Sequence, residues 1–209
     1  MTLLARYVSH RWLAAAVLTF ALSLAPIGCG GGGSRRGSPS APKSPSTASA
    51  PACRAGQLTP AAVEGPFYKP GSPQRERLTE PGLSGQPLTI SGSVLTSDCR
   101  PIAHALLQFW QADTRGHYDQ RGFRLRGHEY TDARGRYKLA TILPGLYPGR
   151  TRHLHVKVAP PGGKVLTTQL YFPNEPRNRT DPLFAVKLLL PLAKAGSGWA
   201  ARFDFVVRG

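Results

Sequence analysis

The stretch "YPGRTRHLHVKV", residues 147–158, decides how the chain folds, because it joins a tight turn to an alternating strand. Pro148 disfavours helical backbone at the residue before it, and the glycine that follows favours a turn. From residue 153 onward polar and apolar side chains alternate, and successive side chains of a strand point to opposite faces. The apolar face is expected to enter a core, and the other face carries His153 and His155.

Six further segments have the character of strands, being short, rich in β-branched and aromatic residues, and separated by turn signals. They span residues 87–96, 104–112, 136–142, 164–172, 184–190 and 201–207. Helical periodicity is scarce. The pattern predicts an all-β fold, a β-sandwich of mostly antiparallel strands whose long loops form the functional site. The last segment is expected to be one strand, with Phe203, Phe205 and Val207 on one face.

Residues 1–28 read as a secretory signal peptide, which would export the protein. Arg6 and Arg11 give a basic start, and the apolar core of about 15 residues is shorter than the roughly 20 that span a bilayer. Cys29 follows, with four glycines after it, which resembles the cleavage site of a bacterial lipoprotein. Lipidation of Cys29 would anchor the protein to a membrane facing the periplasm or the cell exterior. Pro26 departs from that pattern, and ordinary secretion is the alternative.

Residues 29–52 are dominated by Gly, Ser, Pro and Ala and cannot bury apolar area, so they predict a disordered linker. Residues 53–209 have the length of a single domain with one core. Of the formal net charge of +16, this domain carries +11, because the first 52 residues hold five Arg and Lys and no acid. Without a nucleic-acid motif, this charge predicts a preference for anions and no nucleic-acid partner.

Two cysteines remain in the domain, Cys53 and Cys99. In an oxidising compartment an even pair predicts a disulfide. Closing a loop of this length would stabilise the fold by roughly 4 kcal/mol on the chain-entropy model.

His153 and His155 form a candidate metal site, since same-face residues of a strand lie roughly 6.6 Å apart and two imidazoles at that spacing can converge on one ion. Taken alone, the pair is weak evidence for a metal and more often marks a solvated strand face. Tyr147, six residues upstream in a pre-shaped turn, could reach the same ion or pack its ring on the edge of the sandwich. Trp110 is expected in the core beneath the site.

Four fragments together resemble the intradiol ring-cleavage dioxygenases, of the catechol and protocatechuate 3,4-dioxygenase type. In order they are "TPAAVEGPFY" (59–68), "GSVLTSDCRPIAHALLQFWQADTRGHYD" (92–119), "TDARGRYKLATILPGLYPGRTRHLHVKV" (131–158) and "LTTQLYF" (166–172). The resemblance implies a non-haem iron(III) ion with two tyrosinates and two histidines as ligands. At the matching positions stand Tyr118, Tyr147, His153 and His155.

The resemblance also implies the reaction. A catechol would bind the iron, Tyr147 would detach and accept a proton, and O2 would break the ring between the two hydroxylated carbons to give a cis,cis-muconate-type diacid. Iron(III) is a hard cation that suits anionic oxygen ligands. Arg150 matches an active-site arginine that would stabilise negative charge on the substrate. Gln169 matches a glutamine near the pocket that would orient the substrate or a neighbouring group.

Two other functions fit parts of the sequence. A membrane-tethered sandwich that binds without catalysis fits the tether and the charge. A zinc hydrolase would use the two histidines but usually adds a carboxylate or a third histidine. His104, His117 and His128 have no obvious partner, and strand alternation should turn Arg152 away from the metal. No segment of this sequence resembles the helical N-terminal region that pairs subunits in many catechol 1,2-dioxygenases, so we expect the closer likeness to be to the compact, secreted intradiol members. The sequence predicts neither the oligomeric state nor the particular catechol.

Overall fold

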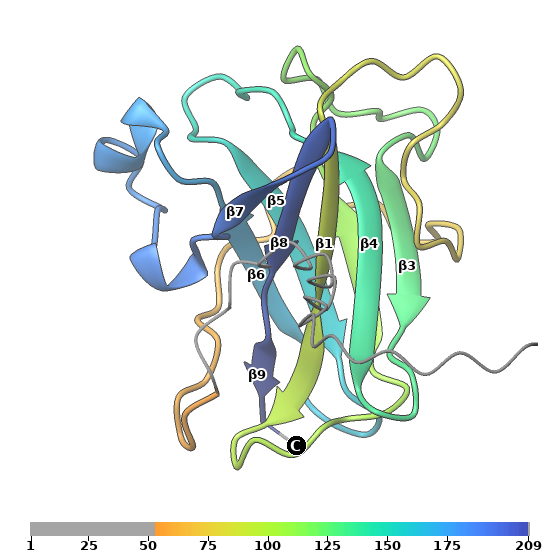
Figure 1. Cartoon of the computed structure of the whole chain (residues 1–209), viewed down its shortest axis with the longest axis vertical. Coiled ribbons are helices and arrows are strands. Elements are labelled where there is room, and N and C mark those ends of the chain that lie inside the picture. The colour runs from red at the N-terminus through yellow and green to blue at the C-terminus, as the bar shows by residue number, and fades with distance from the viewer. Residues whose placement is uncertain (1–52, 209) are drawn as a thin grey trace, which may run out of the picture. The chain divides into compact units, whose positions relative to one another are not determined.

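The protein is described by a computed structural model, in which residues 53–208 are placed. The predicted signal peptide (1–28), the lipidation site Cys29 and the predicted linker (29–52) lie outside these residues. Within them, two β-sheets stack face to face, and Figure 1 shows β1 and β8 in front of β5 and β6. No helix among the described residues is long and apolar enough to cross a membrane.

The strands form a five-stranded and a four-stranded sheet. The first has the order β4-β1-β8-β7 with β9 beside β1, and the second has the order β3-β2-β5-β6. Only the pairs β1–β8 and β1–β9 are parallel among the strand pairs of residues 53–208. The elements are β1 (Pro87–Thr96), β2 (Leu106–Trp110), β3 (Arg126–Tyr130), β4 (Arg136–Ile142), β5 (His153–Ala159), β6 (Leu166–Tyr171), the 3₁₀ turns η1 (Pro176–Arg179) and η2 (Val186–Leu188), β7 (Leu192–Ala195), β8 (Gly198–Arg202) and β9 (Phe205–Val207). The prediction of a mostly antiparallel β-sandwich is confirmed.

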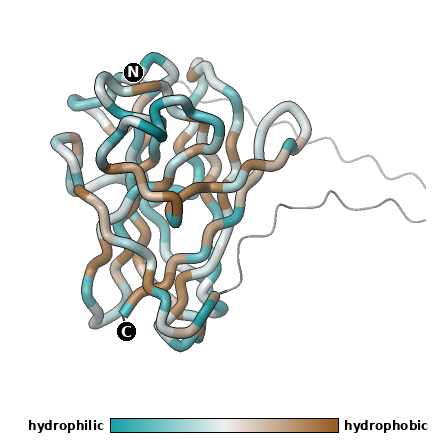
Figure 2. Tube along the Cα trace, turned by 90° about the vertical axis from the view of Figure 1, so that its left-hand side faces the viewer, coloured by the Kyte–Doolittle hydropathy of each residue, from teal (hydrophilic) through white to brown (hydrophobic). Residues whose placement is uncertain are grey.

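The core lies between the two sheets and is built by alternation. Figure 2 shows hydrophobic and hydrophilic residues following one another along the strands. In β5 the apolar side chains predicted to face inward, Leu154, Val156 and Val158, are fully buried. They meet the inward side chains of β1, such as Ile90 and Val94, from the opposite sheet. Burial of this apolar area is the main stabilising contribution to the fold.

The prediction of a strand over residues 184–190 is wrong. This apolar run contains η2 instead, and its only strand-like pairing in the described part of the chain is an isolated bridge from Leu189 to Tyr171. Leu188 and Leu190 are buried while Val186 is exposed. A short turn flanked by prolines thus buries the leucines without a hydrogen-bonded ladder, so an apolar run alone did not distinguish turn from strand.

Residues 201–207 form two strands where the sequence predicted one, because β8 ends at Arg202 and β9 begins at Phe205. At the break, the Asp204 carboxylate accepts the backbone N–H of Ser93 at 2.8 Å, in place of a ladder carbonyl. The β3 and β7 strands were not predicted. The β3 sequence "RGHEY" is polar and lies at a sheet edge, where alternation gives little signal. His128 lies within this strand.

Cys53 and Cys99 are joined by a disulfide, with their Cα atoms 5.9 Å apart. The bond fastens the start of the described chain to the turn that follows β1. It therefore anchors the segment that continues from Cys53 toward the second sheet.

Glu129 of β3 is a buried acid at the edge between the sheets. One carboxylate oxygen accepts the backbone N–H of Lys138 at 3.2 Å, whereas the other has no hydrogen-bond partner among the described residues. Burial raises the pKa of Glu129 to about 7, and the nearby charge of Glu76 acts in the same direction. The folded state therefore holds a proton that the unfolded chain releases at lower pH.

We expect the free energy of unfolding to fall as the pH rises from about 4.5 to 7, since only the folded protein resists losing the Glu129 proton in this range. The loss would be at most about 3 kcal/mol. Glu129→Gln should remove this dependence and be more stable than the wild type above pH 7. Urea unfolding at a series of pH values measures it, with the exposed Glu80→Gln as control. Parallel pH profiles for wild type and Glu129→Gln would contradict the assignment.

Candidate metal centre

The outer face of β5 is buried, so His153 and His155 do not lie on a solvated strand face. Their side chains face away from the core between the sheets, yet they are 4% and 2% exposed. Aromatic residues cover them. Trp110 from β2 stacks on the His155 ring with centroids 4.8 Å apart and planes 8° from parallel.

Three donor atoms meet above this strand. The Tyr118 hydroxyl, from the loop after β2, lies 3.2 Å from His153 Nε2, and the Nε2 atoms of His153 and His155 are 3.1 Å apart. Two ligand atoms each about 2.1 Å from one ion, at about 90–100° to each other, would be about 3.0–3.2 Å apart. The arrangement therefore fits ligation of one shared ion by Tyr118, His153 and His155.

The two imidazoles are held in the form that binds metals. The Thr151 carbonyl lies 2.7 Å from His153 Nδ1, and since a carbonyl only accepts, Nδ1 carries the proton and Nε2 presents its lone pair. Burial lowers the pKa of His153 to about 4 and that of His155 well below its ordinary value. Both rings are therefore neutral at physiological pH, as coordination requires.

Tyr118, unlike the histidines, must become charged to bind a metal ion, because its hydroxyl has to lose a proton. Burial raises the pKa of its hydroxyl above the ordinary value, and the positive charges of Arg150 and Arg126 offset only part of the effect. A phenolate in this environment needs a cation in direct contact with the oxygen. Two neutral imidazoles and one phenol, whose oxygen would become a phenolate on binding, are thus donors that suit a highly charged metal ion.

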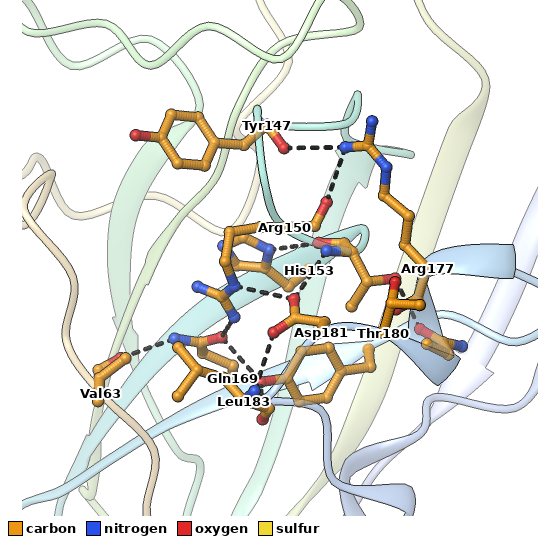
Figure 3. A network of polar contacts seen from close by, with 12 residues as sticks. Val63, Tyr147, Arg150, His153, Gln169, Arg177, Thr180, Asp181 and Leu183 are labelled. Carbon is orange, nitrogen blue, oxygen red and sulfur yellow. Dashed lines mark hydrogen bonds and ion pairs between the residues drawn. The ribbon is translucent and has the colours of Figure 1, made fainter.

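Tyr147 lies next to these donors without joining them. Its half-buried ring packs edge-on against Tyr118, with centroids 5.9 Å apart. Within residues 53–208, no hydrogen bond links its hydroxyl to either histidine. In Figure 3 only the backbone carbonyl of Tyr147 takes part in the polar network. The structure thus gathers Tyr118, His153 and His155, and it places Tyr147 at the rim of the cluster.

Arg150 and Gln169 lie together beside the histidines. Arg150 Nη2 donates to Gln169 Oε1 at 2.8 Å, and the Gln169 amide donates to the Val63 carbonyl at 2.7 Å. Gln169 is fully buried on β6, directly opposite His155 of β5. Residues that the sequence indicated separately are therefore neighbours, and the guanidinium supplies a positive charge close to the donor atoms.

Residues 59–69 cross the site as a covering segment. Phe67 stacks on Tyr118 with ring centroids 4.4 Å apart and planes 11° from parallel. The buried Arg126 holds this segment by donating to the Phe67 carbonyl at 2.6 Å. At Gly65 (φ +74°), a Cβ would lie 3.3 Å from the His155 ring. Glycine therefore allows the covering backbone to lie directly on His155.

Phe67, Arg126 and Asp181 were not identified as site residues from the sequence. Phe67 stands in the motif "EGPFY", which showed the resemblance but no role for the ring. Arg126 and Asp181 lie in polar stretches where charged residues are expected at the surface. Their burial comes only from tertiary contacts, so the sequence offered no signal for it.

The other candidate residues have structural contacts. The His128 ring nitrogen Nδ1 lies 2.7 Å from the Ser72 carbonyl. Arg152 pairs with Glu175 and also donates to the Pro144 carbonyl, away from the histidines. In the described part of the chain, no three His, Cys, Asp or Glu side chains converge to hold a metal. The carboxylate or third histidine that a zinc hydrolase usually adds is therefore not found beside His153 and His155 in these residues.

Comparison with known proteins points to one enzyme family. Residues 63–209 match the family model described as "Dioxygenase". The chain is 32% identical over 155 residues to catechol 1,2-dioxygenase 2 of Acinetobacter lwoffii, covering 62% of this chain and 56% of that protein. It is 31% identical over 154 residues to the protocatechuate 3,4-dioxygenase β chain of Burkholderia cepacia, covering 60% of this chain and 66% of that protein.

Solved structures show the same fold. One is the dioxygenase domain of a dioxygenase–carbohydrate-binding protein fusion from the cellulolytic bacterium Streptomyces sp. SirexAA-E, at 55% identity and a TM-score of 0.71, covering 73% of this chain and 99% of that one. Another is 3-chlorocatechol 1,2-dioxygenase from Rhodococcus opacus 1CP, at 29% identity and a TM-score of 0.66, covering 71% of this chain and 72% of that one. The chain therefore belongs to the intradiol ring-cleaving dioxygenase family, as its motifs predicted. It spans a little over half the length of the first curated relatives it matches.

Replacing Gly65 should test the contact between the covering segment and His155. Gly65→Ala and Gly71→Ala both place a side chain at positive φ, which costs roughly 1–2 kcal/mol. Gly71 has open space where its Cβ would stand, whereas Gly65 faces His155. We expect Gly65→Ala to lose a further 0.5–1.5 kcal/mol or so in urea unfolding. Equal losses in the two variants would show that the segment does not press on His155.

Proposed function

We propose that the chain is a non-haem iron(III) dioxygenase that cleaves a catechol-type ring between its two hydroxylated carbons with O2. The product would be a cis,cis-muconate-type diacid. The observation that supports this most strongly is the convergence of Tyr118 Oη with the Nε2 atoms of His153 and His155, beside Arg150, in a chain of this family.

Tyr118, Tyr147, His153 and His155 would hold the iron. Bound there, iron(III) would bind the catechol oxygens and prepare the ring for reaction with O2. The donor set fits such an ion, because phenolate oxygens suit a hard cation and imidazole is a common ligand of iron. Tyr147 would complete the set from its place beside Tyr118, where its ring is half-buried.

The protein side chains would accept protons from the substrate and stabilise its negative charge. Catechol has two protons to lose. Tyr147 Oη, a phenolate while it holds the ion, would accept one of them, and a hydroxide ion from the solvent would accept the other and leave as water. Arg150 would stabilise the negative charge that develops on the substrate, because its positively charged guanidinium lies in a partly buried site. Gln169 would fix the direction of that guanidinium through its 2.8 Å hydrogen bond. Both atoms of O2 enter the product, so the reaction needs no external reductant.

The proposed substrates are small catechols, since the relatives are named for catechol, protocatechuate and hydroxyquinol. The net charge of +11 over residues 53–209 favours anionic rings. We also propose that the protein is exported and held at a membrane by a lipid on Cys29, with residues 29–52 as a spacer. The basic start and the apolar run of residues 1–28 support this location.

The reaction is tested by oxygen uptake of the iron-loaded full chain with catechol, protocatechuate and hydroxyquinol. We expect one O2 consumed per ring and a dicarboxylic product without an aldehyde, because the break lies between the two hydroxylated carbons. An aldehyde product would show cleavage beside the hydroxyls and contradict the proposed reaction. Binding of a catechol without oxygen uptake would favour the tethered binding module.

Tyr118→Phe should lose ring cleavage, because it removes the one phenol oxygen that contacts His153. We expect bound iron to fall below one per chain and kcat/KM to drop by about 10²-fold or more, equal to about 2.7 kcal/mol of lost stabilisation. Tyr130→Phe is the matched control, because Tyr130 is exposed on β3 and away from the donors. Full iron content and activity in Tyr118→Phe would contradict its role as a ligand.

A further inference from the structure

The segment between β6 and β7 supports the turn that carries Tyr147 and Arg150. Figure 3 shows Arg177, Thr180, Asp181 and Leu183 of this segment gathered beside the turn. The residues on either side of Asp181, Thr180 and Pro182, are exposed, but the Asp181 side chain is 1% exposed. An acid is seldom buried so fully unless every oxygen is satisfied, which directs attention to its partners.

Both oxygens of the Asp181 carboxylate accept hydrogen bonds. Its Oδ2 accepts the Nε–H of Arg150 at 2.8 Å and the backbone N–H of Thr151 at 2.7 Å. Its Oδ1 accepts the backbone N–H of Leu183 at 2.9 Å. The hydrogen bond to Arg150 is charge-assisted. The two hydrogen bonds from backbone N–H groups hold the carboxylate in place independently of the guanidinium. Because the Asp181 carboxylate is itself held by the backbone, it sets the position of the Arg150 side chain.

Arg150 is held from two sides as a result. Nε donates to Asp181, and Nη2 donates to Gln169, so the plane of the guanidinium is determined by two anchors on different elements. A guanidinium with one anchor can rotate about its long side chain, which has several rotatable bonds. Removal of Asp181 would leave Gln169 as the only side-chain anchor of Arg150 among the described residues.

The same segment also fastens the backbone around Arg150. Arg177 Nη1 lies 3.3 Å from the Arg150 carbonyl and 3.4 Å from the Tyr147 carbonyl. Asn178 Oδ1 accepts the Thr151 hydroxyl at 2.6 Å, and the Thr151 carbonyl in turn meets His153 Nδ1. These contacts hold the turn itself, whereas Asp181 is the residue of the segment that contacts the functional end of Arg150.

We propose that Asp181 is a positioning residue for the ring-cleaving reaction, acting through the orientation of Arg150. This assignment rests on the proposed function, since it is Arg150 that would contact the substrate. It places a determinant of activity in a connecting segment, about 30 residues along the chain from the side chain it controls.

A double-mutant cycle on the iron-loaded full chain tests the assignment. Asp181→Asn keeps the size of the side chain but replaces an accepting oxygen by a donor, so it should lower kcat/KM by roughly 10–100-fold. In an Arg150→Gln background the same change should have less than about a threefold effect, because its target is gone. The dissociation constant of 4-nitrocatechol, measured without oxygen, should follow the same pattern.

Glu175→Gln is the matched control. Glu175 lies in the same segment and pairs with an arginine, but that arginine is Arg152, which points away from the donors. We expect kcat/KM of Glu175→Gln within about threefold of wild type. Equal factors for Asp181→Asn in both backgrounds, or a loss of binding sites at an unchanged dissociation constant, would show a merely structural role and overturn the assignment. An inactive wild-type chain would instead overturn the proposed function, and this assignment with it.

Discussion

Burial of β5 on both faces fixes the strand that carries both the core between the sheets and the candidate metal centre. One face fills the core between the sheets with Leu154, Val156 and Val158. The other face would expose two imidazoles, but Trp110 and the covering segment 59–69 remove them from water. A strand covered on both sides has little freedom to shift, because a slip of one residue would exchange apolar side chains for histidines. The site is therefore as fixed as the core.

The same burial determines the electrostatics of the site. Removal of water keeps the histidines neutral and makes the Tyr118 phenolate depend on a cation. The positive charge of Arg150 lies close to the donor atoms, and the negative charge of Asp181, whose side chain is 1% exposed, compensates the cost of removing it from water. The same burial thus provides the neutral histidines that could bind a metal and the oriented Arg150 cation that could bind an anionic substrate. We regard this arrangement as the physical basis of the proposed chemistry.

Strand alternation and local motifs were sufficient to predict the sandwich, the inward face of β5 and the family, since each depends on residues that are close in the chain. The run 184–190 was taken for a strand because apolar residues bury equally well from a 3₁₀ turn. The support from Asp181 could not be foreseen, because an acid in a polar loop gives no sign of burial until the fold brings Arg150 to it. Alternation also left open whether the histidine face was solvated, since covering by residues 59–69 is a long-range contact.

The measurement to make first is the visible absorption spectrum of the iron(III)-loaded full chain, recorded before and after catechol is added without oxygen. Ligation by Tyr118 or Tyr147 predicts a tyrosinate-to-iron charge-transfer band that gives the protein colour. Direct binding of catechol to the same ion predicts that this band shifts and that new absorption appears at longer wavelength. An iron-loaded protein without such a band, or with a band that catechol leaves unchanged, would contradict the account.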